Sequence, residues 1–296
     1  MKKTLIALNI FLKTIKTNKM KKIIMVTMLM FLATAVFCQA KAFQVVKSGK
    51  GNPVLFLPGF TTPGSVWNET IAHLSSKKET HIISYAGFNG IAAVDTPWYA
   101  AIKEQLVQYI VKEKLSHLTI IGHSMGGTLA IDIAATLPAK VDKLILVDAL
   151  PCLRELMMPG VPASQILYNS PYNSKLLQMS DTSFRKTATM MAKGMTLNNS
   201  KKDTLLEWMM EADRKTYVFG YVDLLKLDLR ETLKFVKAKT LIIGAPNTNA
   251  EVTKANFEKQ YANLAFKTIE MAVNSNHFIM FDQPAWFYEQ VNSFLK

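Results

Sequence analysis

The stretch that most constrains this chain is an apolar run that ends in a glycine-flanked serine. Residues 118–130 read LTIIGHSMGGTLA, with β-branched residues before Ser124 and a helix-like apolar pattern after it. This order is typical of a strand, a sharp turn and a helix, with the serine hydroxyl exposed at the apex of the turn. Ser124 is therefore the candidate nucleophile, and the rest of the chain must supply a base, an acid and an oxyanion hole.

The elements around this turn predict an α/β fold. Short apolar runs alternate with amphipathic runs, which indicates a mainly parallel twisted sheet with helices on both faces. The expected strands are residues 43–46, 54–57, 81–85, 118–122, 143–150, 240–245 and 266–273. The turn-rich segment 48–53 suits a hairpin between the first two strands. Helices are expected from Ser65, as an N-cap, and at residues 98–114, 125–137, 250–264 and 285–295.

The alternation of strands and helices stops between about residues 151 and 239. This segment holds helical fragments, eight methionines and no clear strand. A helical insertion between two sheet strands predicts a cap over the carboxyl edge of the sheet, where open α/β folds bind their ligands. Four of its residues are candidates for a flexible apolar substrate pocket, although they could equally pack the cap onto the body. They are Met157, Met158, Met191 and Trp208.

The first 42 residues have the layout of a secretory signal peptide. Residues 1–22 are rich in lysine, and residues 23–37 form a continuous apolar run. Translation could also start at Met20, with the first nineteen residues an upstream extension. The apolar run is shorter than the ~20 residues that a bilayer span needs, so a cleaved signal is favoured over a retained anchor.

Cleavage after Ala40 or Ala42 satisfies the preference for small residues at the cleavage site. The folded domain is expected to comprise residues 43–296, and the mature protein is expected to be periplasmic or secreted. Removing the eight lysines of residues 1–42 lowers the formal charge from +13 to +5. No basic run with interleaved aromatic residues remains, so no nucleic-acid partner is expected, and no membrane contact beyond the export signal.

Three motifs resemble those of the α/β-hydrolase fold family, and the likeness extends from residue 43 onward. They are the elbow GHSMGG at residues 122–127, the turn PGF at residues 58–60, and SNHFIMFDQPAWF at residues 275–287. Family members place a nucleophile, an acid and a histidine in that order along the chain, and Ser124, Asp148 and His277 keep this order. A serine at the elbow argues for acyl transfer through a covalent acyl-enzyme. No metal or other cofactor is expected, because the histidines are scattered along the sequence and cysteines are nearly absent.

The resemblance gives the remaining catalytic roles to a histidine and two backbone amides. His277 follows the last expected strand, where the family places its general base. The oxyanion hole is expected from the amides of Phe60, in the loop after an early strand, and Met125, the residue after the nucleophile. His123, beside the nucleophile, is expected to point away from the site and to contribute to packing.

The acid is the part of the pattern that departs from the commonest family arrangement. That arrangement has an aspartate shortly after the strand that follows the cap, but residues 241–249 contain no carboxylate. Some members carry the acid after the strand that follows the nucleophile helix, where Asp148 lies. An acid there would hold the imidazole tautomer and stabilise the imidazolium. Asp148 could instead only bind local loop amides, in which case Asn247, Asn249 or Glu251 would be the candidates.

Three other carboxylates are expected to have structural roles. Asp223 and Asp228, where the cap returns to the body, are expected to form ion pairs with neighbours such as Arg230. Asp282 precedes Pro284 and is expected to cap the last helix.

The function expected from these residues is hydrolysis of a small or medium apolar carboxylic ester, lactone or related acyl compound by an exported enzyme. The expected partner is thus a small-molecule acyl substrate. One alternative is a non-catalytic binding member of the fold, motivated by the missing carboxylate after the post-cap strand. A second is a cofactor-free, perhydrolase-like reaction on the same residues.

Overall fold

A seven-stranded sheet forms the centre of the computed structural model, which describes residues 40–246 and 249–296. The strand order is β1-β3-β2-β4-β5-β6-β7, and every neighbouring pair is parallel except β1 with β3. The strands are β1 (Phe43–Ser48), β2 (Pro53–Leu57), β3 (Glu79–Tyr85), β4 (Leu118–His123), β5 (Val141–Val147), β6 (Lys239–Gly244) and β7 (Lys267–Met271). The predicted fold class is confirmed.

The central strands are buried on both faces. Leu144 and Leu146 of β5 join the apolar core on one face of the sheet, while Ile145 and Val147 join the core on the other face. Because successive strand residues point to opposite faces, a strand covered on both sides must be apolar throughout. This is why the continuous apolar runs of the sequence mark the middle of the sheet.

The predicted hairpin between the first two strands is wrong. β1 pairs antiparallel with β3, with Phe43 opposite Tyr85, and β2 lies between β3 and β4. β2 is almost completely buried, whereas most of β1 is exposed. The apolar run of β2 therefore belongs in the interior of the sheet, and the half-polar β1 belongs at its edge.

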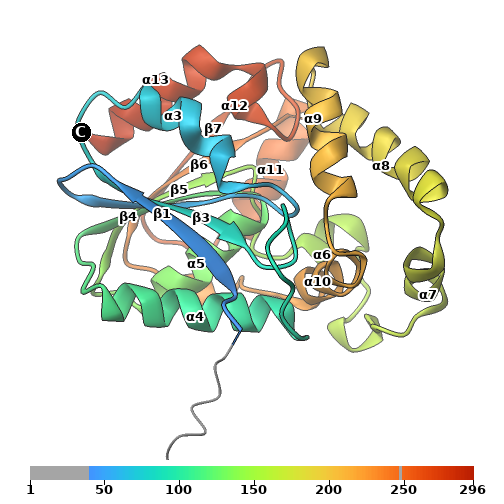
Figure 1. Cartoon of the computed structure of the whole chain (residues 1–296). Coiled ribbons are helices and arrows are strands. Elements are labelled where there is room, and N and C mark those ends of the chain that lie inside the picture. Colours follow the sequence, from blue (N-terminus) through green and yellow to red (C-terminus); the bar gives the residue numbers. More distant parts are fainter. Residues whose placement is uncertain (1–39, 247–248) are drawn as a thin grey trace, which may run out of the picture. The chain divides into compact units, whose positions relative to one another are not determined.

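Helices cover both faces of the sheet (Figure 1). The helices of this part of the chain are α3 (Asn68–Ala72), α4 (Trp98–Lys112), α5 (Met125–Thr136), α11 (Ala250–Gln260), α12 (Ile279–Asp282) and α13 (Pro284–Leu295). Ser65 is not the predicted N-cap, because a 3-10 turn over Gly64–Trp67 precedes α3 and begins directly after Pro63. The Gly64 amide donates instead to the Ser84 hydroxyl at 2.9 Å.

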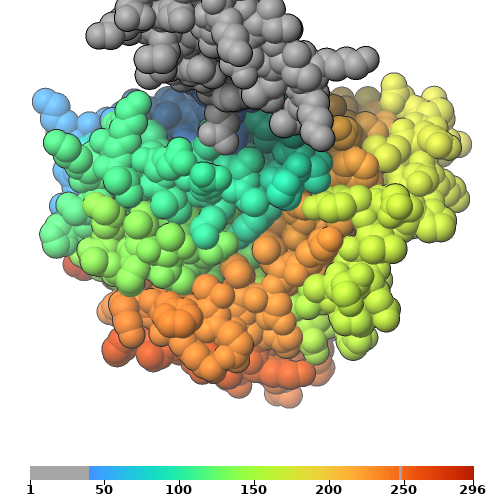
Figure 2. All heavy atoms as spheres, turned by 90° about the horizontal axis from the view of Figure 1, so that it is seen from below, coloured from blue at the N-terminus to red at the C-terminus, as the bar shows by residue number. Residues whose placement is uncertain are grey.

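The segment 151–238 contains only helices and loops, and every one of its residues is described. Its elements are α6 (Leu153–Met157), η2 (Ala163–Gln165), α7 (Pro171–Gln178), α8 (Asp181–Met195), α9 (Asn199–Met210), α10 (Arg214–Lys226) and η3 (Thr232–Phe235). We call the part from α6 to α10 the cap. Figure 2 shows it, in yellow-green to orange, adjoining the green surface of the sheet and its helices.

The predicted signal peptide, with the possible start at Met20, lies outside the described residues except at its last positions. Residues 41–296 form one compact unit. None of the helices among the described residues is long and apolar enough to span a bilayer.

Candidate active site

Ser124 occupies a strained turn between β4 and α5. Its backbone has φ 54° and ψ −122°, a region that non-glycine residues rarely adopt. The turn is sterically possible only because glycines lie two residues before and two residues after Ser124. A Cβ on Gly122 would lie 2.3 Å from the Gly126 carbonyl oxygen, and one on Gly126 would lie 2.2 Å from that of Leu57. The glycines thus permit the strand-to-helix turn that the sequence predicts.

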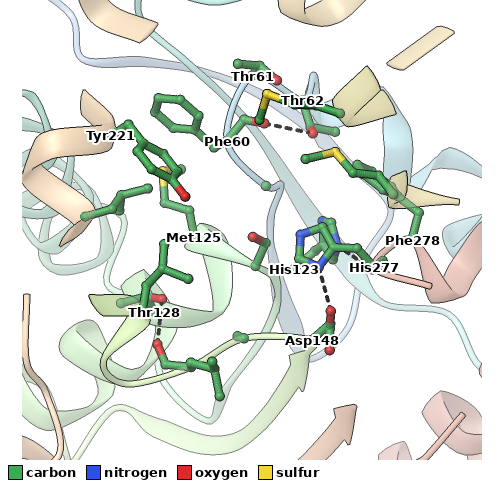
Figure 3. Close-up of a pocket in the computed structure, with 18 of the residues that line it drawn as sticks. Phe60, Thr61, Thr62, His123, Met125, Thr128, Asp148, Tyr221, His277 and Phe278 are labelled. Carbon is green, nitrogen blue, oxygen red and sulfur yellow. Dashed lines mark hydrogen bonds and ion pairs between the residues drawn. The ribbon is translucent and has the colours of Figure 1, made fainter. Parts of the chain in front are cut away.

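Asp148 and His277 are hydrogen-bonded to each other. His277 Nδ1 donates to Asp148 Oδ2 at 2.6 Å, as Figure 3 shows. Asp148 follows β5 with φ 43°, and its other oxygen accepts from the Ala245 amide at 2.9 Å. Both side chains are mostly buried. The carboxylate is therefore held from two sides, and its hydrogen bond leaves Nε2 of His277 as the free ring nitrogen.

Ser124, Asp148 and His277 line one cavity. No hydrogen bond joins the Ser124 hydroxyl to His277 among the described residues, and such bonds often form only in the substrate complex. Nothing in this arrangement requires a residue from the 247–251 loop.

Two of the alternatives to Asp148, Asn249 and Glu251, are among the described residues and lie at the start of α11. Asn249 caps α11, because its Oδ1 accepts from the amides of Glu251 and Val252 at 3.0 and 3.1 Å. Glu251 is exposed on that helix. Asn247 lies outside the described residues.

Two of the structural expectations for other carboxylates are wrong. Asp223 is not paired with Arg230; it accepts from the Tyr99 amide at 3.0 Å and from the Tyr168 hydroxyl, because α10 lies against the start of α4. Asp282 does not cap the last helix, whose first turn lacks a side-chain cap. Asp228 does bind Arg230, at 2.6 Å.

His123 lies within the site and does not point away from it. Its ring is fully buried, lines the cavity and lies 4.5 Å from the His277 ring, centroid to centroid. His123 Nε2 donates to the His277 carbonyl oxygen at 2.9 Å, so the neutral ring has its lone pair on Nδ1. Burial, together with the nearby His277, holds the pKa of His123 well below its ordinary value. The His123 ring is thus uncharged and packs against His277.

The loop after β2 approaches Ser124 closely. A Cβ on Gly59 would lie 2.8 Å from His123 Nδ1 and 3.5 Å from Ser124 Cβ, so only glycine fits there without displacing a neighbour. The next amide is that of Phe60, and the amide of Met125 opens α5. Neither amide has an acceptor among the described residues. Both N–H groups are therefore available at the site, one of them at a helix N-terminus that favours negative charge.

The cavity has a volume of about 410 Å³ and an apolar wall contributed largely by the cap. Met157, Met191 and Trp208 line it. Met158 does not: it follows the end of α6, where the backbone leaves the helical conformation, and its side chain is exposed on the surface.

Two tyrosines of α10, Tyr217 and Tyr221, line the cavity, and Tyr221 was not identified as a candidate from the sequence. The rings of Tyr217 and Tyr221 each lie 5.8 Å from the Phe60 ring, and Figure 3 shows Tyr221 and Phe60 on the same side of the cavity. Burial raises the pKa of Tyr217 to about 12. Burial also raises the pKa of Tyr221, so both phenols are neutral at physiological pH. Their spacing of four residues on one helix face was the available signal.

A mainly parallel sheet in which one strand ends in a strained, glycine-flanked serine defines the α/β-hydrolase class. Residues 54–290 match the model of the alpha/beta hydrolase family, and the chain belongs to this family.

Known proteins similar to this chain include esterases and a lactonase. A pimeloyl-[acyl-carrier protein] methyl ester esterase from Wigglesworthia glossinidia brevipalpis is 24% identical over 86% of this chain and 97% of its own. An esterase from Exiguobacterium antarcticum has a TM-score of 0.71 at 20% identity, covering 86% of this chain and 95% of its own. The enol-lactonase from Burkholderia xenovorans LB400 has a TM-score of 0.70 at 14% identity, with the same coverage. The family and the esterase relative support an enzyme of the carboxylic ester hydrolase kind.

Proposed function

We propose that this protein is a serine hydrolase that cleaves a small or medium apolar carboxylic ester, lactone or related acyl compound. The observation that carries the proposal is the 2.6 Å bond from His277 Nδ1 to Asp148 Oδ2 in the cavity that Ser124 also lines. It supplies a strained serine with an oriented base and a buried acid.

The proposed reaction has two steps with the same residues. As the Ser124 oxygen attacks the acyl carbon, His277 Nε2 takes the hydroxyl proton, and Asp148 stabilises the resulting imidazolium. The amides of Phe60 and Met125 donate to the oxyanion of the tetrahedral intermediate. Collapse of this intermediate breaks the ester bond, and His277 passes its proton to the departing alcohol. Water then attacks the acyl-enzyme with His277 again as base, which releases the acid and restores Ser124.

The cavity supports an apolar acyl group of limited length. Its volume is at the lower end of the range typical of small-molecule sites, and methionine, leucine and aromatic side chains dominate its wall. The names of the relatives, a methyl ester esterase and an enol-lactonase, agree with an ester or lactone bond as the target.

A panel of p-nitrophenyl esters tests the substrate class. We expect the highest kcat/KM for the butyrate or hexanoate ester. The value for the palmitate ester, whose chain exceeds the cavity, should be lower by at least about tenfold. Initial rates at matched concentrations give the comparison, with p-nitrophenyl phosphate as a control that should not react. Fastest turnover of palmitate, or no turnover of any ester, would contradict the proposed substrate class.

The reason for considering a non-catalytic member of the fold is weakened by the position of Asp148. That alternative arose because the loop after β6 lacks a carboxylate, whereas Asp148 reaches His277 from the end of β5.

We also propose that the protein is exported and that signal peptidase cleaves after Ala40. Ala42 is fully buried; its amide donates to Gln105 Oε1 and its carbonyl oxygen accepts from the Ala86 amide, both at 2.9 Å. Cleavage after Ala42 would therefore remove a residue that belongs to the folded domain.

N-terminal sequencing of the protein from the periplasm of a Gram-negative host should give Lys41 as the first residue. Replacing Ala40 with tyrosine should block this cleavage, because the site requires a small residue. A first residue of Phe43, or an uncleaved cytoplasmic protein, would refute the proposed site.

A further inference from the structure

The loop that carries His277 is hydrogen-bonded to the cap through the residues before and after His277. The Asn276 side-chain amide donates to the Gly194 carbonyl oxygen, and the Phe278 backbone amide donates to that of Met195, both at 3.0 Å. Gly194 and Met195 form the C-terminal end of α8. The last turn of a cap helix therefore holds the backbone next to the candidate base.

Asp282, at the end of α12, adds a third connection between the same two parts. Its Oδ1 accepts from the Thr196 hydroxyl at 2.5 Å and from the amides of Leu197 and Asn198 at 2.9 and 3.1 Å. Its Oδ2 accepts from the Asn276 amide at 2.8 Å. One oxygen thus binds the turn between α8 and α9, and the other binds the residue before His277.

The two cap helices joined by this turn also form part of the cavity wall. Met191 and Met195 come from α8, and Leu205, Trp208 and Met209 come from α9. A substrate that fills this part of the cavity therefore contacts the helices whose connecting turn binds Asp282.

We propose that Asp282 is a positioning residue that couples contact between substrate and the α8–α9 helix pair to the alignment of His277. Esters long enough to contact this helix pair stabilise the turn at residues 196–198. Because Asp282 is hydrogen-bonded both to this turn and to Asn276, the loop that carries His277 is stabilised as well. Acyl-chain length then affects kcat as well as binding. The inference rests on the proposed function, because it assumes that His277 is the base of an ester hydrolase.

The test is the Asp282→Asn variant. An asparagine has one acceptor oxygen, so either the three donors of the cap turn or the Asn276 amide would face an NH2 group. We expect kcat for p-nitrophenyl hexanoate to fall roughly 10–100-fold, since small misplacement of a catalytic group has effects of this size. The kcat preference for hexanoate over acetate should shrink, while the KM ratio of the two esters stays within about twofold because the cavity wall is unchanged.

Two further variants separate positioning from a general weakening of the cap. Glu207→Gln breaks the exposed ion pair with Arg185, which joins α8 to α9 at 2.7 Å away from the His277 loop. It should leave both kcat values unchanged, as exposed pairs contribute little. Thr196→Val removes one donor to Asp282 and should reproduce the effect of Asp282→Asn in the same direction but more weakly. If Asp282→Asn does not fold, Thr196→Val provides the test of the coupling in its place.

A readout without turnover distinguishes failure of this inference from failure of the proposed function. The His277 Nδ1 proton bonded to Asp148 should give a downfield proton NMR signal that exchanges faster in Asp282→Asn than in the wild type. An unchanged signal together with an unchanged hexanoate-to-acetate kcat ratio would overturn the coupling. Equal losses in Glu207→Gln would overturn it as well. A wild type with the signal but without esterase activity would instead refute the proposed function.

Discussion

Replacing Ser124 with alanine is expected to lower kcat for p-nitrophenyl hexanoate by at least about 10⁴-fold, because no other group can form the acyl-enzyme. The residual rate would come from the oxyanion amides and substrate binding alone. Steady-state turnover of the purified variant, corrected for spontaneous hydrolysis, gives the ratio.

The fold should tolerate this change. Alanine removes only the hydroxyl, and the unusual backbone angles at residue 124 already exist in the wild type. The Ser124→Ala variant should therefore unfold at a temperature close to that of the wild type and still bind the hexanoate product. Activity within a hundredfold of the wild type would exclude Ser124 as the nucleophile.

Replacing Asp148 with asparagine should reduce kcat by about 10⁴-fold, the size found when the acid of a serine-hydrolase triad becomes an amide. The asparagine oxygen can still accept from the Ala245 amide, as Oδ1 now does at 2.9 Å. Its NH2 group then faces His277 Nδ1 and stabilises the tautomer with its proton on Nε2. That tautomer cannot accept the Ser124 proton.

The matched control is Glu251→Gln, which removes the exposed carboxylate of the other candidate region. It should keep wild-type kcat, and both variants are measured with the same ester. If Asp148→Asn stays within tenfold of the wild type while Glu251→Gln loses activity, the acid lies in the loop after β6.

The sheet and the turn that carries Ser124 could be predicted because both follow from local sequence. The apolar runs of β4, β5 and β6 are long enough to indicate strands buried on both faces, and the glycines around Ser124 allow only a tight turn. Asp148 and His277, which the structure shows hydrogen-bonded to each other, were proposed from the order of motifs along the chain rather than from any local signal.

The contacts that support these residues could not be predicted, because they join distant parts of the chain. The Thr196 hydroxyl is hydrogen-bonded to Asp282, which lies 86 residues further along the chain. His123 is hydrogen-bonded to the His277 carbonyl oxygen, 154 residues further along. The local sequence predicted that Asp282 caps a helix, because a proline follows closely. It predicted that His123 only packs in the interior, because it lies next to Ser124. Likewise, β1 pairs with β3 because the apolar β2 occupies the interior of the sheet and leaves the edge to β1. This arrangement depends on all the strands together and is not visible in the hairpin-like segment between β1 and β2.

The most direct test of the central claim is the site of covalent modification by a fluorophosphonate. Mass spectrometry of the labelled wild-type protein should show one adduct, and peptide mapping should place it on Ser124. The adduct should be absent from Ser124→Ala and should form much more slowly in Asp148→Asn. A folded wild-type protein that takes up no label, or takes it up at another residue, would contradict the assignment of Ser124 as the nucleophile of an ester hydrolase.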